Sequence, residues 1–258
     1  MSRFLLFIIA VLFIACVPSK PTHAVRADTT SFVIANYNNC RSSSQLVDYY
    51  AFSVLFHEVK KLPICVSYEL VSEHTDGPFS RKHLKFIPDE HIDLIQADDT
   101  DYRGSGWSRG HMAPAGDFKW TEKGMQETFF YTNCCPQNET LNNGSWHSLE
   151  KRVRYWAKKY GKIYVATGPI IGTNRFGTIG PHKVVVPDGF FKALLVCVDG
   201  KYHAIAFYMQ NIPDRQSMKD CYMTIDELEA LSGIDFFPFL EDIVEKMVEA
   251  EVNTSVWF

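Results

Sequence analysis

The 258-residue sequence predicts an α+β domain with a mostly antiparallel central sheet and flanking helices. First, segments with strand character outnumber helical ones, and they lie at 62–71, 163–171, 183–186, 190–198 and 201–209. Second, helices and strands do not alternate in the regular rhythm of parallel βαβ units. The hydrophobic content of 46% and the charged content of 22% are ordinary for a soluble globular domain.

The predicted strands follow from local sequence. Residues 62–71 read LPICVSYELV, a β-rich run, and the polar, turn-rich stretch 73–106 after it indicates an irregular connection. We expect the strand at 163–171 to end where Gly168 and Pro169 interrupt it. Asp199 and Gly200 favour a tight hairpin between the last two strands.

Three helices are predicted. The first begins near residue 142, and its apolar stripe consists of Trp146, Leu149, Val153, Trp156 and Tyr160. Basic residues lie largely off this stripe. Thr224 and Glu227 form a capping-box sequence at the start of a second helix, and Gly233 favours its end. Residues 239–250 predict a third, acidic helix.

The first 45 residues have the character of a leader and a tether. Residues 1–16 combine Arg3 with a short apolar run from Phe4 to Ala15, which is typical of an export signal. Cys16 follows a small residue, as in a bacterial lipoprotein signal, so lipid attachment and plain secretion are both open. Residues 17–45 are polar and predict a tether. The folded domain is then expected over residues 46–258, in a periplasmic, outer-membrane or extracellular protein.

Six cysteines remain after Cys16, namely Cys40, Cys65, Cys134, Cys135, Cys197 and Cys221. An even number in an exported protein permits disulfides. Each can equally be a small buried hydrophobic residue. No CxxC pair is present, so a structural zinc site has little support.

The stretch from Asp101 to Asp117 carries the first candidate chemistry. Arg109 and His111 stand two residues apart in a segment with four glycines, which disfavours a regular helix. A guanidinium pairs well with phosphate, and an imidazole can accept a proton near neutral pH. This stretch alone is a weak signal, because most histidines have no catalytic role.

A second candidate lies at the start of the first predicted helix. In a helix that begins near Asn142, the side chains of Asn142, Trp146 and Glu150 share one face. An amide oxygen and a carboxylate would then lie two turns apart near a helix N-terminus. The alternative is an ordinary capped amphipathic helix with a solvated basic face.

Taken together, these segments resemble the DNA/RNA non-specific endonucleases of the ββα-metal class. The resemblance rests on SRGHMAP at 108–114, FYTNCCPQ at 130–137 and LNNGSWHSLE at 141–150. It continues through DYRGSG at 101–106, YVATGP at 164–169 and the stretch 226–238, and so covers residues from about 60 to 250. It implies a ββα-metal active-site motif, with DNA and RNA as substrates.

The resemblance also implies residue roles. His111 matches the general base that activates a water molecule, and Asn142 matches the single protein ligand of a metal, usually Mg²⁺, with Mn²⁺ as a substitute. Glu150 resembles the carboxylate that holds metal-bound water. Family members are often dimers, so a homodimer is implied, although no segment identifies an interface.

Four further residues match positions near the family's site. Arg109 matches the motif arginine, and Arg81 more loosely matches an upstream arginine that holds phosphate. Asn133 and Gln137 match positions that contact the substrate or orient the site. For Arg81, Asn133 and Gln137 a buried hydrogen-bonding role is an equal alternative.

Two observations keep a second function open. Ser108 stands where most family members carry Asp, which removes a negative charge beside Arg109 and His111. The net charge of −4 argues against a protein that coats nucleic acid, although not against an enzyme with a local basic groove. The alternative function is therefore a catalytically impaired, nucleic-acid-binding surface protein. Serine-nucleophile and P-loop signatures are absent from the sequence.

Overall fold

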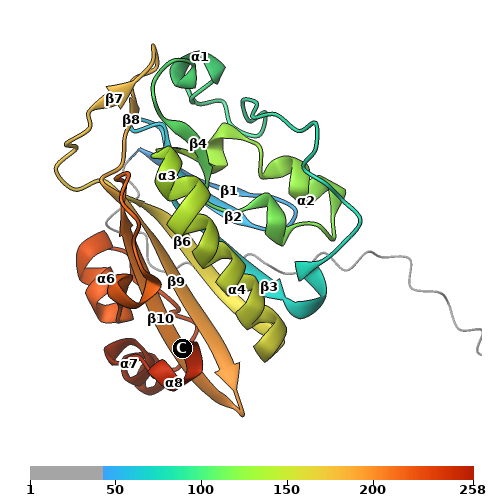
Figure 1. The fold of residues 1–258 in the computed structure, drawn as a ribbon, viewed down its shortest axis with the longest axis vertical. Helices are drawn as coiled ribbons and strands as arrows, with labels where there is room; N and C mark the ends of the chain where they lie inside the picture. The colour runs from blue at the N-terminus through green and yellow to red at the C-terminus, as the bar shows by residue number, and fades with distance from the viewer. Residues whose placement is uncertain (1–42) are drawn as a thin grey trace, which may run out of the picture.

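The computed structural model describes residues 43–258. A seven-stranded antiparallel sheet with the order β1-β2-β3-β6-β9-β10-β11 forms its centre (Figure 1), which confirms the predicted α+β class. The strands are β1 Ser44–Asp48, β2 Ser53–His57, β3 Leu62–Val71, β6 Lys162–Ile170, β9 Gly189–Val198, β10 Lys201–Gln210 and β11 Tyr222–Met223. The predicted domain start at residue 46 lies inside β1. The predicted signal at 1–16, Cys16 and most of the 17–45 tether lie outside the described residues.

The sheet is buried on both faces because its central strands carry apolar residues on both sides. In β9, Phe190 and Leu194 belong to one core, whereas Phe191 and Ala193 belong to the other. Helices α4 (His147–Tyr160) and α8 (Thr254–Trp257) cover the first face, and α6 (Ile225–Ser232) and α7 (Asp242–Ala250) cover the second. The result is a three-layer arrangement of helix, sheet and helix (Figure 1).

Most predicted elements are confirmed, with small shifts. The β9–β10 hairpin turns at Asp199 and Gly200, whose φ angles of 50° and 76° suit a tight turn. Strand β6 does not stop at Gly168 as predicted. It continues to Ile170 because Gly168 approaches the neighbouring strand closely: a Cβ there would lie 2.2 Å from the Ile64 carbonyl oxygen. Predicted strand 183–186 is only the short β8 (Val184–Val185), paired with β7 (Thr178–Ile179).

The predicted helix signals are also largely confirmed. Thr224 and Glu227 form the capping box of α6, and Gly233 ends this helix at φ 70°. Helix α7 begins at Asp242, three residues later than expected. The remaining elements are η1 Ser72–Thr75, α1 Asp99–Tyr102, β4 Ser108–His111, η2 Ala115–Asp117, α2 Glu122–Glu127, η3 Tyr131–Asn133, β5 Cys134–Gln137, α3 Glu139–Leu141, η4 Asn142–Trp146 and α5 Met218–Cys221.

Cys134, Cys135, Cys197 and Cys221 carry free thiols. Cys134 and Cys135 are completely buried, as expected of small hydrophobic residues; Cys40 lies outside this region. Within residues 43–258, no helix is long and apolar enough to span a membrane.

Candidate active site

Strands β4 and β5 followed by α4 form the ββα unit that the resemblance implies. The two strands are antiparallel, with His111 opposite Cys134 and Gly110 opposite Cys135. Gly110 has to be glycine because a Cβ there would lie 2.2 Å from Oε1 of Gln137. After β5, the Asn138 side chain accepts a hydrogen bond from the Thr140 backbone N–H and starts the helical segment that leads into α4.

His111, the last residue of β4, is 8% exposed. Its ring centroid lies 4.6 Å from that of Phe86 and 4.8 Å from that of Phe129. Burial, assisted by the nearby positive charge of Arg81, lowers the pKa of His111 to about 3. The imidazole is therefore neutral at pH 7. Its Nε2 atom is buried and has no hydrogen-bond partner in the described part of the chain. This nitrogen is therefore free to accept a proton, as a general base must.

Arg81 is an exposed cation beside this imidazole. Its guanidinium carbon lies 5.4 Å from the ring centroid of Phe129, and its charge acts on both His111 and Glu150. Within residues 43–258, no carboxylate lies at ion-pair distance from it. Arg81 thus remains available for an anionic ligand.

The helix that carries Asn142 and Glu150 differs from the prediction. It begins at Glu139, and residues Asn142–Trp146 form a π-helical turn before α4 starts at His147. Residues eight apart in an ordinary α-helix are rotated by about 80° from alignment, since each turn takes about 3.6 residues. The wider π turn reduces this rotation and brings Asn142 and Glu150 closer to one line. Both are half-buried, whereas Trp146 between them is completely buried.

Glu150 lies in a charged cluster that the sequence did not reveal. Burial raises the pKa of Glu150 to about 7, and the opposite charge of Lys192 partly offsets this effect. Lys192 is 1% exposed; its Nζ atom lies 3.2 Å from Oγ1 of Thr167 and 4.7 Å from the ring centroid of Trp146. Burial lowers the pKa of Lys192 to about 8. No sequence pattern indicates a role for Lys192, because it lies alone in an apolar strand.

Asp117 and Arg154 form a second part of this cluster. Nη1 of Arg154 donates a 2.6 Å hydrogen bond to Oδ1 of Asp117, and the Tyr68 hydroxyl donates to Oδ2 at 2.8 Å. Arg154 is one of the basic residues off the apolar stripe of α4. Its side chain is engaged with Asp117 and is not part of a solvated basic face. Arg154 follows Glu150 by one helical turn, and this spacing could have indicated that the two side chains lie close together.

Arg109 is already engaged within the protein. It forms an ion pair with Asp99, and its Nε donates a 3.1 Å hydrogen bond to the Tyr131 hydroxyl. Its guanidinium also lies over the ring of Tyr102, 5.1 Å from the centroid. We therefore expect Arg109 to support β4, with less freedom than Arg81 to meet a phosphate.

Asn133 and Gln137 are both completely buried. The Asn133 amide makes three hydrogen bonds of 2.9 Å, two with Ala113 and one with the Thr128 carbonyl oxygen. It therefore fixes the chain directly after His111, and we expect a positioning role and no substrate contact. The Gln137 amide has no hydrogen-bond partner among the described residues. Gln137 of β5 pairs with half-exposed Ser108 of β4, where the resemblance implies Asp in most family members.

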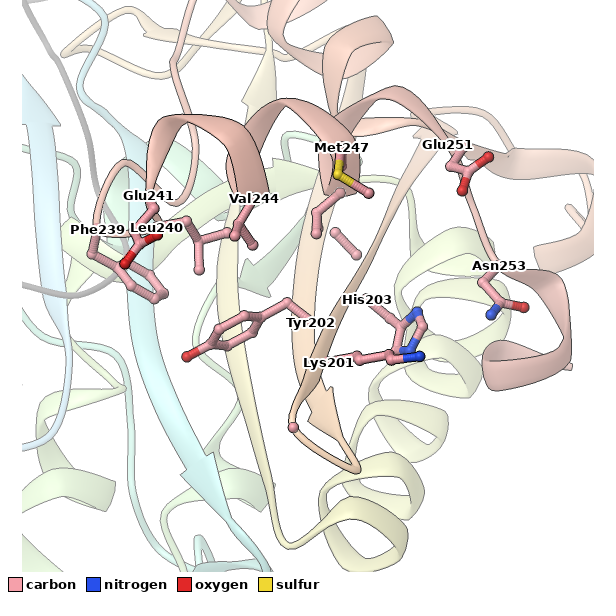
Figure 2. Close-up of a pocket in the computed structure, with 13 residues that line it drawn as sticks. Lys201, Tyr202, His203, Phe239, Leu240, Glu241, Val244, Met247, Glu251 and Asn253 are labelled. Atoms are coloured by element: carbon pink, nitrogen blue, oxygen red, sulfur yellow. The ribbon is translucent and has the colours of Figure 1, made fainter.

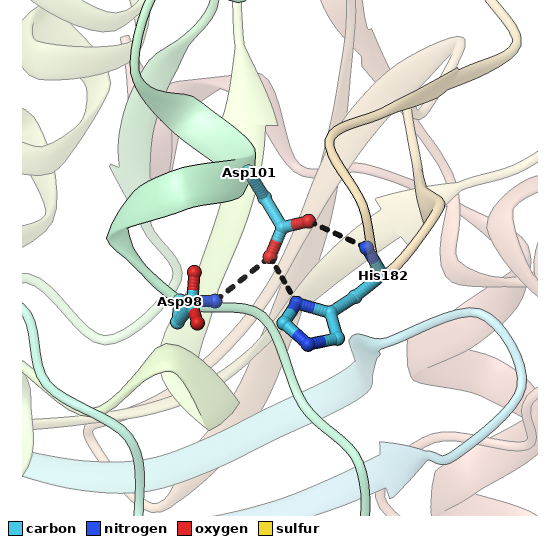
Figure 3. Close-up of side chains that lie close together, drawn as sticks. All are labelled: Asp98, Asp101 and His182. Carbon is cyan, nitrogen blue, oxygen red and sulfur yellow. Dashed lines mark hydrogen bonds and ion pairs between the residues drawn. The ribbon is translucent and has the colours of Figure 1, made fainter.

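A separate cluster of Asp98, Asp101 and His182 brings three ligand-type atoms within 4.8 Å of one another. The buried Asp101 carboxylate accepts hydrogen bonds from the backbone N–H groups of Asp98 and His182 and contacts Nδ1 of His182 at 2.8 Å (Figure 3). Both carboxylate oxygens are therefore used to join α1 to the β7–β8 connection. This hydrogen bonding accounts for the cluster without a metal.

The chain is similar in sequence to known proteins. The chain is 35% identical over 209 residues to a protein named "Nuclease EXOG, mitochondrial" from Xenopus laevis, covering 75% of this chain and 58% of that protein. It is 32% identical over 183 residues to human "Endonuclease G, mitochondrial", covering 66% and 62%. The chain thus spans about three fifths of the length of these relatives.

Structural and family comparisons lead to the same family. A chain in a crystal structure of an EndoG/EndoGI complex aligns with a TM-score of 0.72 and 27% identity, covering 76% of this chain and 86% of that one. The family model for DNA/RNA non-specific endonucleases matches residues 31–243. This chain therefore belongs to the DNA/RNA non-specific endonuclease family.

Proposed function

We propose that this protein is a metal-dependent nuclease that hydrolyses phosphodiester bonds of DNA and RNA with little sequence preference. The observation that carries the proposal is the buried, neutral imidazole of His111, whose unpartnered Nε2 lies beside the free cation Arg81. A neutral nitrogen can accept a proton, and a neighbouring guanidinium attracts the phosphate whose hydrolysis needs that base.

The proposed reaction uses these two groups directly. Nε2 of His111 takes a proton from a water molecule, and the water oxygen forms a new bond to phosphorus. The bond between phosphorus and the leaving oxygen breaks, and the leaving oxygen keeps the electron pair and takes up a proton from solvent. Arg81 holds the phosphate and offsets the negative charge that develops on its oxygens.

Asn142 and Glu150 fit a hard divalent cation. The donors are an amide oxygen and a carboxylate on one side of the helix, and the Asn142 side chain makes no hydrogen bond within the described residues. Mg²⁺ prefers such oxygen donors and keeps several water molecules, and Mn²⁺ accepts similar ligands. When bound, the ion supplies positive charge near the phosphate and the leaving oxygen. Glu150 would orient its water, and Lys192 would help to keep Glu150 ionised.

Lack of sequence preference follows from a site built for phosphate. Contacts to the sugar-phosphate backbone carry no direct sequence information. Exposed Lys151 and Arg152 on α4 would attract the polyanion, so activity should fall as salt concentration rises.

Export, a lipid anchor on Cys16 and a homodimer complete the proposal. Export and lipidation rest on residues 1–16 alone, and the homodimer rests on the family resemblance alone. Two of the relatives described above carry mitochondrial names. Intact-mass measurement of the mature chain from its native cell tests the first two: loss of residues 1–15 with a lipid on Cys16 is expected, and an unprocessed N-terminus would contradict export. Light scattering tests the dimer.

A digestion assay tests the activity. The full chain is incubated with plasmid DNA or single-stranded RNA in the presence of Mg²⁺, Mn²⁺ or EDTA. We expect both substrates to be degraded with either metal and neither to be degraded with EDTA. Asn142→Ala should raise the Mg²⁺ concentration needed for half-maximal rate, whereas the exposed neighbour variant Asn143→Ala should not. Binding without cleavage under either metal would support the impaired, nucleic-acid-binding alternative instead.

A further inference from the structure

Five carboxylates from three segments meet between α6 and α7, on the sheet face opposite His111. Asp226 and Glu229 lie on α6, Glu245 and Glu249 on α7, and Asp235 between the helices. One oxygen each from Asp226, Glu229 and Glu249 lies within 4.8 Å of the others. Like charges this close repel, so the folded chain has to neutralise them.

Within residues 43–258, no lysine, arginine or histidine forms an ion pair with any of the five. Glu229 uses one oxygen to accept a 2.7 Å hydrogen bond from the Phe236 backbone N–H. Glu249 is only 7% exposed, and its Oε1 is buried with no hydrogen-bond partner in the described structure. A buried carboxylate oxygen without a partner is costly, which points to a ligand that is bound there.

The orientation of α7 gives a second reason. An amphipathic helix normally turns its apolar side to the core. Here Ile243 and Met247 are 77% and 68% exposed, while Glu249 is turned inward. Val244 and Met247 line an open groove of about 740 Å³ beside Tyr202 (Figure 2). Val248 of the same helix packs against the core, so Glu249 is buried beside it, and the burial of this carboxylate has to be compensated.

We propose that Asp226, Glu229 and Glu249 bind a Ca²⁺ ion that fastens α7 to α6. The three side-chain donors are carboxylate oxygens, and Ca²⁺ takes six to eight oxygen ligands in flexible geometry. Zinc would favour nitrogen or sulfur, and Mg²⁺ demands a near-ideal octahedron. Asp235 and Glu245 are close enough to add negative charge around the ion. The site lies in a different core from His111 and does not depend on the proposed catalytic activity.

The test measures Ca²⁺ binding and thermal unfolding of the full chain carrying Asn142→Ala, so that the proposed catalytic metal ligand is absent. After dialysis against EDTA, calorimetric titration should show one Ca²⁺ bound per chain. Ca²⁺ at a hundred times its dissociation constant should raise Tm by about 5–10 °C. Adding Glu249→Gln should weaken binding at least about tenfold and abolish most of the Tm shift, because it removes one charged ligand.

The matched control is Glu251→Gln, an exposed carboxylate just after α7, which should retain the binding and the shift. Absence of Ca²⁺ binding would overturn the proposal, and so would an unchanged response in Glu249→Gln. A Tm that responds to pH and not to Ca²⁺ would also overturn it, because protons would then neutralise the cluster.

Discussion

Replacement of Asn133 by alanine tests whether this residue positions the site or contacts the substrate. The change removes an acceptor and two donors that lie completely buried, and it leaves the Ala113 N–H, the Ala113 carbonyl and the Thr128 carbonyl without their partners. Each unsatisfied buried group costs about 1–3 kcal/mol. Partial relaxation lowers the sum, so we expect a loss of roughly 3–6 kcal/mol from a typical total of about 5–15 kcal/mol.

Urea denaturation followed by tryptophan fluorescence measures this loss. The matched control is Asn143→Ala, because Asn143 is exposed and its truncation should change stability by no more than about 0.5 kcal/mol. A variant Asn133→Ala that unfolds within about 1 kcal/mol of wild type and yet loses activity would refute the positioning role. It would instead support the substrate contact that the sequence pattern allowed.

Three further predictions concern the site. Gly110→Ala should destabilise the fold, seen as a lower urea midpoint, because its Cβ would lie 2.2 Å from Oε1 of Gln137; an unchanged midpoint would contradict this packing. The pKa of Glu150 is raised to about 7, so activity should fall as pH drops through this value and the carboxylate protonates. Glu150→Gln should be slower, and its pH–rate profile should lack this fall in rate at acidic pH. If the fall persists in the variant, a group other than Glu150 causes it. Arg81→Ala should weaken nucleic-acid binding and reduce its salt dependence, whereas Arg109→Ala should mainly lower the urea midpoint; the reverse pattern would exchange their roles.

Elements that depend on neighbouring residues in the sequence could be predicted. The hairpin at Asp199 and Gly200 requires positive φ at two successive positions, and the α6 capping box needs only Thr224 and Glu227. These signals are local, so tertiary contacts did not override them. The end of β6 was misplaced because the role of Gly168 depends on a neighbouring strand that the sequence does not reveal.

The site could be predicted only in part, for the same reason. The family motif predicts His111, Asn142 and Glu150 as site residues, but no sequence pattern predicted the π turn that brings the last two closer to one line. Lys192 is contributed by a distant strand, and it acts on Glu150 only because the sheet brings the two together. Local sequence patterns do not predict which single charged residues the tertiary fold brings together.

One kinetic comparison tests most directly whether His111 is the general base. The initial rate of plasmid cleavage at saturating Mg²⁺ is measured for wild type, His111→Ala and the control His203→Ala, whose histidine lies on β10 beside the distant groove. We expect His111→Ala to lose about 10²–10⁴-fold in rate, the usual contribution of a general base, while it keeps a cooperative urea transition, and we expect His203→Ala to retain activity. Cleavage by His111→Ala at close to the wild-type rate would contradict the account.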